Sequence, residues 1–164
     1  MDRFDTHPRG GVGWRMLSEL ISPDAVTLDL AGPGKDEVLT ELVALLDVDP
    51  RNAAALHRML RRREALGSTG VGRGVAIPHA RSLVVDRLRL AFGRHTAGIA
   101  YDAIDARPVH HFFLIVAPPV ELSNQYLPVL GRIAQFVKEP DVPARLSALA
   151  APADLFALLR EKGL

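Results

Sequence analysis

Residues 67–82, GSTGVGRGVAIPHARS, hold the feature from which the organisation of the chain can be worked out. Four glycines within positions 67–74 predict a break in regular structure, because glycine adopts backbone conformations that other residues avoid. The run at 75–77 then predicts a short strand. Pro78 and His79 follow directly. The stretch therefore predicts a histidine presented at the end of a strand, beside an irregular backbone.

The hydrophobic pattern on both sides of this stretch predicts strands and helices in mixed order. Alternation or short apolar runs predict strands over residues 25–30, 75–77, 87–92 and 112–116. Three- and four-residue spacing of apolar residues predicts helices over residues 35–46, 50–66, 123–138, 142–149 and 152–161. Strands mixed with helices along one chain favour an α/β fold, a single three-layer domain.

Two strands and one helix carry specific expectations about burial. Within 87–92, leucine and phenylalanine alternate with arginine, which predicts a half-buried strand. The uninterrupted apolar run at 112–116 predicts a central strand. Ser123 is expected to cap the helix that follows. The expected apolar stripe of that helix consists of Leu127, Leu130, Ala134 and Val137.

The composition is that of one ordinary globular domain, with 164 residues, 20 Lys+Arg against 19 Asp+Glu, and a net charge of +1. This balance gives no reason to expect nucleic acid or a membrane surface as a partner. The absence of cysteine excludes disulfides and thiol chemistry. No stretch approaches the ~18 apolar residues of a membrane helix, and the polar start has no signal-peptide core. We expect a cytoplasmic protein with a mobile segment at 1–13 and one domain at 14–164.

The side chains around His79 predict an anion site. Ser68 and Thr69 precede it and Arg81 follows it. Hydroxyls, free backbone amides and cations are the groups that hold phosphate. The residues alone leave open whether His79 is a nucleophile, a metal ligand or a buried hydrogen-bonding group. The glycines form neither a P-loop, since no Gly-Lys-Ser/Thr is present, nor a dinucleotide fingerprint, since a strand rather than a helix follows.

Arg63 is a second candidate site residue. It lies three residues past Leu60 in the predicted helix, so it is expected near the buried side at the helix end. There it can face residues 67–74, the glycine segment. Arg61 and Arg62 are instead expected on a solvated face.

Four other histidines are expected to be structural or exposed. His57 lies beside the apolar stripe of its helix, and His95 is expected on a loop surface just after a strand. His110 and His111 open the central strand, and adjacent strand residues point to opposite faces, so they are not expected to bind one metal ion together. We expect no metal site and no cofactor.

At GSTGVGRGVAIPHA, residues 67–80, the chain resembles the type-2 enzyme IIA domains of the bacterial phosphotransferase system, the mannitol/fructose and nitrogen-regulatory group. LSELISPDAVTLDL and KDEVLTELVALL look like that family's N-terminal strand and helix. LRRREALGSTG is similar to its arginine–glutamate stretch, and IAYDAIDARPVHHFFLIVAPP to its later segment leading into a strand. The likeness covers roughly residues 17–162.

The resemblance implies a fold, a mixed β-sheet flanked by helices, and a phosphoryl-carrier function. His79 would accept a phosphoryl group, through Nε2, from the phosphohistidine of an HPr-like phosphocarrier protein. Arg63, Ser68 and Thr69 are then expected to support the bound phosphate. Sugar-transport members pass the group to an enzyme IIB domain, whereas in nitrogen-type members the phosphorylation state governs binding to regulatory partners.

One position departs from the family pattern. A second histidine usually begins the helix after the central strand, close to the acceptor. The matching residue here is Tyr126, which can donate an O–H to phosphate but carries no positive charge near pH 7. It is also expected to pack on the apolar side if it has no such role. The rate of transfer and the stabilisation of the phosphoryl group therefore depend on what Tyr126 does.

Two classes of function remain open. The first is a phosphoryl carrier of the nitrogen-regulatory type, an expectation that comes from the single domain without a membrane part or an attached IIB domain. A sugar-transport IIA component is a less favoured form of it. The second is a regulatory docking module that is weakly phosphorylated or not phosphorylated, which the loss of the second histidine favours. A metal-dependent hydrolase is disfavoured, since no convergent ligand set is visible.

Overall fold

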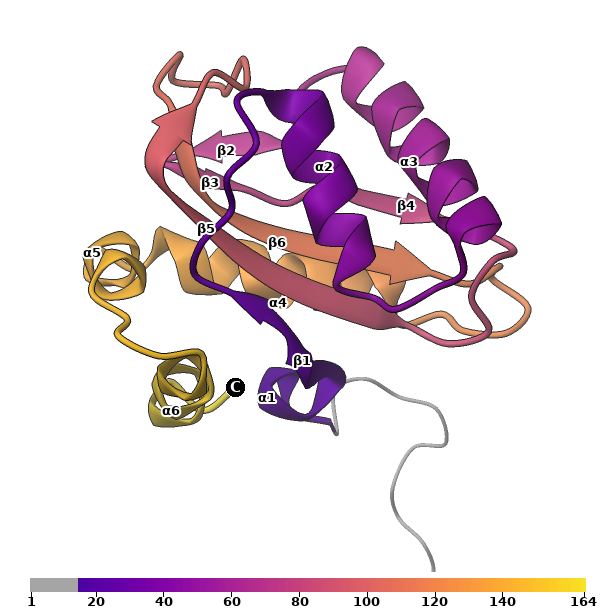
Figure 1. The fold of residues 1–164 in the computed structure, drawn as a ribbon. Coiled ribbons are helices and arrows are strands. Elements are labelled where there is room, and N and C mark those ends of the chain that lie inside the picture. Colours follow the sequence, from indigo (N-terminus) through magenta and orange to yellow (C-terminus); the bar gives the residue numbers. More distant parts are fainter. Residues whose placement is uncertain (1–14) are drawn as a thin grey trace, which may run out of the picture.

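The computed structural model of the protein describes residues 15–164, so the segment 1–13 that we expected to be mobile lies outside the described residues. The model contains one mixed β-sheet with helices packed on both of its faces (Figure 1). The predicted α/β class and the three-layer arrangement are confirmed.

The sheet is built around its two longest strands, β5 and β6, which pair antiparallel. Its order is β1-β5-β6-β3-β2, and β4 also pairs with β6. The pairs β1–β5, β3–β6 and β4–β6 are parallel, which makes the sheet mixed. The strand bounds are Ile21–Thr27 for β1, Gly70–Gly72 for β2, Val75–Ala76 for β3, His79–Arg81 for β4, Arg89–Ile99 for β5 and Val109–Ala117 for β6.

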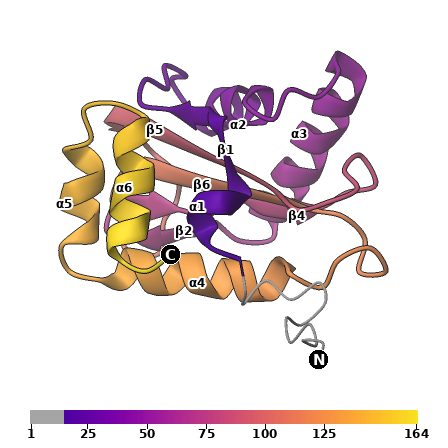
Figure 2. The same cartoon turned by 90° about the horizontal axis from the view of Figure 1, so that it is seen from below.

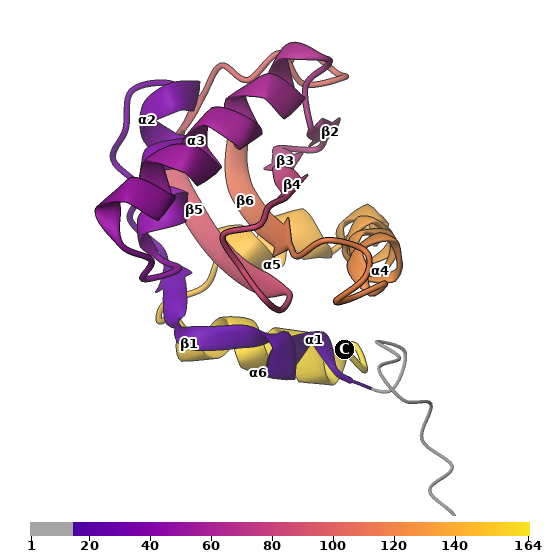
Figure 3. The ribbon, with the colours of Figure 1, turned by 90° about the vertical axis from the view of Figure 1, so that its right-hand side faces the viewer.

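The helices separate into two groups by the face of the sheet that they cover. α2 and α3 lie on one face, while α4, α5 and α6 lie on the other (Figures 1 and 3). Figure 2 shows the second group from below, with α1 beside α6. Their bounds are Leu17–Leu20 for α1, Lys35–Ala44 for α2, Pro50–Ala65 for α3, Tyr126–Lys138 for α4, Val142–Ser147 for α5 and Ala153–Glu161 for α6. Within residues 15–164, no helix has the length and apolar character needed to cross a membrane.

The glycine segment is more regular than its composition predicted. β2 and β3 form a small antiparallel hairpin, and the two residues between them, Arg73 and Gly74, both have positive φ (58° and 78°). Such a pair gives a turn whose twist matches that of the flanking strands. The prediction of a wholly irregular backbone before His79 was therefore wrong, because the glycines serve a turn and a close approach of backbones.

Two burial expectations were also wrong. β5 is buried along most of its length rather than half-buried, because helices cover both faces of the sheet at this strand. In α4 the side chain of Leu127 is 70% exposed, and the fully buried residues are Val129, Ile133, Phe136 and Val137. The helix begins at Tyr126 instead of near Ser123, and Ser123 accepts a bond from the Gln125 N–H rather than capping the first turn. The central position of β6 is confirmed.

Candidate functional site

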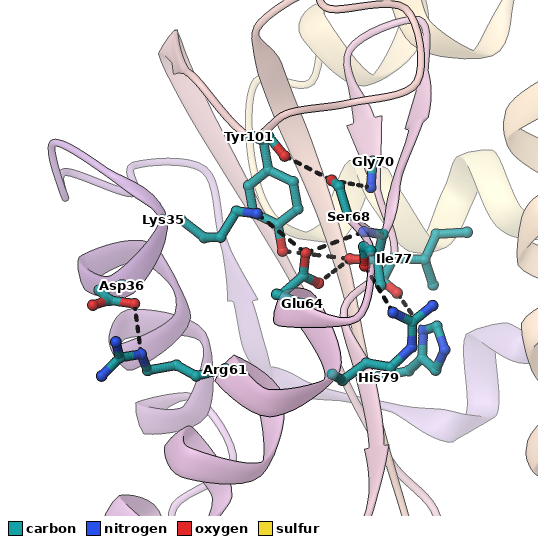
Figure 4. Close-up of polar contacts among 12 residues, drawn as sticks. Lys35, Asp36, Arg61, Glu64, Ser68, Gly70, Ile77, His79 and Tyr101 are labelled. Carbon is teal, nitrogen blue, oxygen red and sulfur yellow. Dashed lines mark hydrogen bonds and ion pairs between the residues drawn. The ribbon is translucent and has the colours of Figure 1, made fainter.

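His79 is the first residue of β4 and lies half-buried between α3 and α4. Its Nδ1 lies 2.6 Å from the carbonyl oxygen of Ile77 (Figure 4). A carbonyl oxygen can only accept, so Nδ1 carries the ring proton in this contact. The neutral ring then has its lone pair on Nε2, which is the nitrogen available for attack.

The surroundings of His79 favour its neutral form. Burial lowers the pKa of the imidazole below its ordinary value of 6.5, and the nearby positive charge of Arg63 acts in the same direction. The hydrogen bond to Ile77 and the negative charge of Glu64 oppose this effect without overcoming it. His79 is therefore a neutral, potentially nucleophilic imidazole at pH 7.

Tyr126 lies directly against His79, as the resemblance to the family pattern implied. The two ring centroids are 5.7 Å apart and the rings meet edge to face. Burial raises the pKa of the Tyr126 phenol to about 12, so it remains a protonated O–H donor at neutral pH. Tyr126 thus places a neutral O–H group beside the His79 ring, without a titratable charge near pH 7.

Arg63 occupies the last turn of α3, and its charge acts on both His79 and Tyr126. Its Nη1 donates to the carbonyl of Gly67 over 2.7 Å, which closes the end of α3 onto the start of the glycine segment. The helix stops there because Gly67 has a φ of 152°. Arg63 therefore contributes a cation at the site and fixes the local backbone.

Ser68 and Thr69 are brought near the site, but their hydroxyls are engaged elsewhere. Ser68 Oγ donates to the carbonyl of Tyr101 over 2.6 Å and accepts from the Gly70 N–H over 3.0 Å. The Thr69 hydroxyl donates to the buried carboxylate of Glu64. Both side chains hold the glycine segment in place, so the structure does not aim either hydroxyl at a ligand.

The segment around Tyr101 approaches the glycine segment so closely that a side chain is excluded. A Cβ placed on Gly70 would lie 2.7 Å from the Cβ of Ala103. The Ile104 N–H donates to the carbonyl of Gly70 over 3.1 Å. Gly70 is thus required for this contact, which supports the backbone that leads to His79.

A buried polar network behind the site was not predicted. The Glu64 carboxylate accepts from the Thr69 N–H over 3.1 Å and pairs with Lys35 Nζ at 3.4 Å (Figure 4). The same Lys35 Nζ lies 4.3 Å from the ring centroid of Tyr101, whose pKa is raised by burial. Glu64 stands next to Arg63 in the sequence, but nothing local indicates that it turns inward. Lys35 and Tyr101 reach it from distant parts of the chain.

The other histidines of residues 15–164 lie outside this cluster. His95 is within β5 and buried, with Nε2 2.8 Å from the carbonyl of Gly32, so the expected loop-surface position was wrong. β5 runs past it because its ladder with β6 continues to Ile99. His110 and His111 open β6, as predicted. Within residues 15–164, no three His, Asp or Glu side chains gather in a way that could hold a metal ion.

Comparisons with known proteins agree with this architecture. The family model described as "Phosphoenolpyruvate-dependent sugar phosphotransferase system, EIIA 2" matches residues 19–162. A nitrogen regulatory protein of Bradyrhizobium diazoefficiens is 32% identical over 133 residues, covering 80% of this chain and 86% of that protein. The fructose-specific EIIABC component of Bacillus subtilis is 30% identical over 132 residues, covering 79% of this chain but only 21% of that longer protein.

A solved structure gives the same result at the level of the fold. The nitrogen regulatory protein IIA-Ntr from Neisseria meningitidis superposes with a TM-score of 0.78 and 29% identity, covering 87% of this chain and 98% of its own. Together, the match to the family model over nearly the whole described chain and the shared fold show that this chain belongs to the EIIA 2 family of the phosphoenolpyruvate-dependent sugar phosphotransferase system.

Proposed function

We propose that this protein is a phosphoryl carrier of the nitrogen-regulatory type, which accepts a phosphoryl group on Nε2 of His79 from an HPr-like phosphocarrier. The observation that carries the proposal is the 2.6 Å contact between Nδ1 of His79 and the carbonyl of Ile77. It leaves a half-buried neutral imidazole with its lone pair on the other nitrogen. The family membership supports the reaction class.

The phosphoryl transfer needs no added acid or base, because one N–P bond forms as another breaks. The lone pair of Nε2 forms the new N–P bond while the N–P bond of the donor phosphohistidine breaks, and its electron pair returns to the donor ring nitrogen. Positive charge develops on the His79 ring, whose Nδ1–H faces the carbonyl oxygen of Ile77. The donor ring leaves as a neutral imidazole, and no proton has to move.

The phosphoryl oxygens need donors, and two side chains supply them in this proposal. Arg63 contributes a fixed positive charge, and the Tyr126 phenol contributes a neutral O–H. Ser68 and Thr69 serve a supporting role, since their hydroxyls already hold the glycine segment that leads to His79.

The surface beside the site suits a protein partner rather than a small substrate. Leu66 is 86% exposed and follows Arg63 by three residues, while Leu127 is 70% exposed and follows Tyr126 directly. Exposed leucines next to charged and polar groups are typical of docking surfaces. The partners that fit are an HPr-like carrier as donor and a regulatory protein or a IIB domain as the next contact.

The nitrogen-regulatory branch is supported by relatives that carry this name and that the chain covers over most of their own length. The Bradyrhizobium protein and the Neisseria structure carry that name, and each aligns over most of its own length. The Bacillus relative is a fructose-specific component, so a sugar-transport role is the less favoured form of the proposal. A cytoplasmic location is part of the proposal and rests on the family.

The test is phosphoryl transfer from a phosphorylated HPr-like carrier, followed by intact mass at neutral pH. The wild type should gain about 80 Da, the mass of one phosphoryl group, in an acid-labile form, and His79→Ala should gain nothing. His57→Ala is a matched control that should behave as the wild type. Phosphohistidine NMR should place the adduct on Nε2, and an adduct on Nδ1 would contradict the role given to Ile77.

A second candidate function is a docking module that is weakly phosphorylated or not phosphorylated. The observation that favours it is Tyr126, which replaces the usual second histidine at 5.7 Å from the His79 ring. Under this alternative the wild type gains no phosphate, while the donor remains competent toward another acceptor. Tyr126→His would then restore incorporation.

A further inference from the structure

We propose that Arg81 is a positioning residue for phosphoryl acceptance, because it holds Tyr126 and the segment leading into α4 against His79. The inference rests on the proposed function at His79 and deepens it. It assigns a role to a side chain that has no direct contact with the reacting imidazole. It also explains how a tyrosine can occupy the place of the second histidine.

The geometry joins the three side chains into one unit. His79 and Arg81 are the first and last residues of β4, and residues two apart on a strand project from the same face. Tyr126 lies over both of them. Its ring centroid is 5.7 Å from that of His79 and 4.7 Å from the guanidinium carbon of Arg81, a distance typical of a cation–π contact.

Arg81 is itself fixed by the backbone that precedes Tyr126. Its Nη1 lies 2.7 Å from the carbonyl oxygen of Pro118 and 3.4 Å from that of Ser123. These two carbonyls lie near the two ends of segment 118–125, which connects β6 to α4. One guanidinium group therefore ties both ends of this connection to the strand that carries His79.

Two apolar side chains of segment 118–125 point into solvent instead of packing, since Val120 and Leu122 are 60% and 62% exposed, while Pro118 is buried. The carbonyls of Pro118 and Ser123 both meet Arg81 Nη1. The position of the first α4 residue, Tyr126, therefore depends in part on the anchor that Arg81 provides. A displacement of about 1 Å at a reacting group is enough to slow a reaction substantially.

Arg81 also acts on the phenol through its charge. Its positive charge opposes the rise in the pKa of Tyr126 that burial causes. A cation near a phenol favours loss of the proton and so strengthens the O–H as a hydrogen-bond donor. The pair thus presents to the phosphoryl group a polarised neutral donor, in a place where the family usually has an imidazole.

A double-mutant cycle tests this role in the full-length protein. The variants are Arg81→Gln, Tyr126→Phe and the two combined, and the initial rate of phosphoryl acceptance from a phosphorylated HPr-like carrier is measured for each. Arg81→Gln should slow acceptance on the order of 10-fold in the wild-type background. In the Tyr126→Phe background it should slow acceptance by no more than about 2-fold, since the donor that it positions is already gone.

Arg87→Gln is the matched control, because it removes one arginine from the exposed turn after β4 without touching Tyr126. It should leave the rate unchanged. Arg81→Lys keeps the charge but not the planar group, so it should remain slow. An Arg81→Gln effect of equal size in both backgrounds would overturn the inference, since Arg81 would then act independently of Tyr126.

A measurement on the unphosphorylated protein separates this inference from the proposed function. The nuclear Overhauser contact between the Tyr126 and His79 rings should be present in the wild type and weaker in Arg81→Gln. An undiminished contact in the variant overturns the positioning role. Failure of the wild type to accept phosphate from a competent donor instead overturns the proposed function, whatever the ring contact shows.

Discussion

At His79, one backbone carbonyl decides which ring nitrogen keeps its lone pair. The Ile77 carbonyl requires a proton on Nδ1. Burial and the Arg63 charge lower the pKa of the imidazole and so favour its neutral form. Tyr126 and Arg63 then differ in kind, since one is a neutral donor and the other a permanent cation. Neither Tyr126 nor Arg63 changes its charge near neutral pH.

This arrangement predicts the pH dependence of phosphoryl acceptance. Because burial lowers the pKa of His79, the neutral nucleophile persists below pH 6.5, and the rate should stay flat from pH 6.5 to about 9. Acidification should reduce the rate only at a pH below 6.5, where the pH approaches the lowered pKa of His79. Quenched-flow transfer at several pH values measures this, with a second acceptor reporting on the donor. A second inflection between pH 7 and 9 would show that another group titrates in the site.

His111 predicts a pH dependence of stability that is independent of function. Burial, together with the charges of His110 and Arg94, lowers the pKa of His111 to about 4. Between pH 6.5 and 4 the unfolded chain binds the proton and the folded chain does not, so stability falls as the pH falls. The loss should reach on the order of 3 kcal/mol.

Urea unfolding at pH 7 and pH 4.5 measures this effect, with His111→Gln as the test variant. The variant has no proton to take up, so its loss between the two pH values should be smaller than that of the wild type by about 2–3 kcal/mol. His57→Gln, on a partly exposed helix face, serves as the control and should follow the wild type. Equal losses in His111→Gln and the wild type would contradict the linkage.

At the scale of elements, the junction between α3 and the β2–β3 hairpin carries the site. α3 ends at Ala65, and its last buried residue is Glu64. The Glu64 carboxylate accepts hydrogen bonds from both the N–H and the hydroxyl of Thr69. Lys35 from α2 completes the pairing of that carboxylate. A buried carboxylate needs all of these partners, because an unpaired one is costly. The helix end and the glycine segment are therefore fixed relative to each other.

Thr69→Val should destabilise this junction. The substitution keeps the shape of the side chain but removes the hydroxyl that donates to Glu64, and losing a partner of a buried carboxylate costs about 1–3 kcal/mol. Urea denaturation measures the loss. Thr40→Val is a matched control, since its hydroxyl donates to the Asp36 carbonyl on an exposed helix surface, and its effect should stay within about 0.5 kcal/mol. A cost for Thr69→Val no larger than for Thr40→Val would contradict the role of the network.

At the scale of the whole molecule, β6 connects two hydrophobic cores. Phe113, Ile115 and Ala117 face the core formed with α4, α5 and α6. Phe112, Leu114 and Val116 face the core formed with α2 and α3. The continuous apolar run in the sequence is thus the two-sided pattern expected of a strand covered on both faces.

Because the two cores share one sheet, the described part of the chain should unfold as one cooperative unit. Leu39→Ala on one face and Leu155→Ala on the other should each cost about 2–5 kcal/mol, since both side chains are fully buried. Far-UV circular dichroism and tyrosine fluorescence should report coincident transitions in both variants. Separate transitions for the two probes would show that the faces fold independently.

The local features of the chain determined much of this protein. Glycine at the end of α3, the cap and proline at its start, and the apolar run of β6 act on the residues beside them, so α3, β6 and the α/β class could be predicted. The short elements β2 and β4 could not, and His79, expected at the end of the strand 75–77, is instead the first residue of β4. Family resemblance supplied the pairing of His79 with Tyr126, and the structure confirms that the two rings meet.

Only the tertiary structure decided where the polar side chains around the site go. Ser68 turns to the Tyr101 carbonyl, and Thr69 turns to Glu64, away from the place where sequence reasoning put a phosphate. Arg81 meets Tyr126 because β4 and the start of α4 are packed together. The Ser68–Tyr101 and Arg81–Tyr126 contacts join segments that are distant in the sequence, while Thr69 and Glu64 are five residues apart but meet only because the chain turns back at the end of α3. Each contact depends on which backbone arrives beside the side chain. Local pattern cannot contain that information, whereas the packed sheet and its two helical layers supply it.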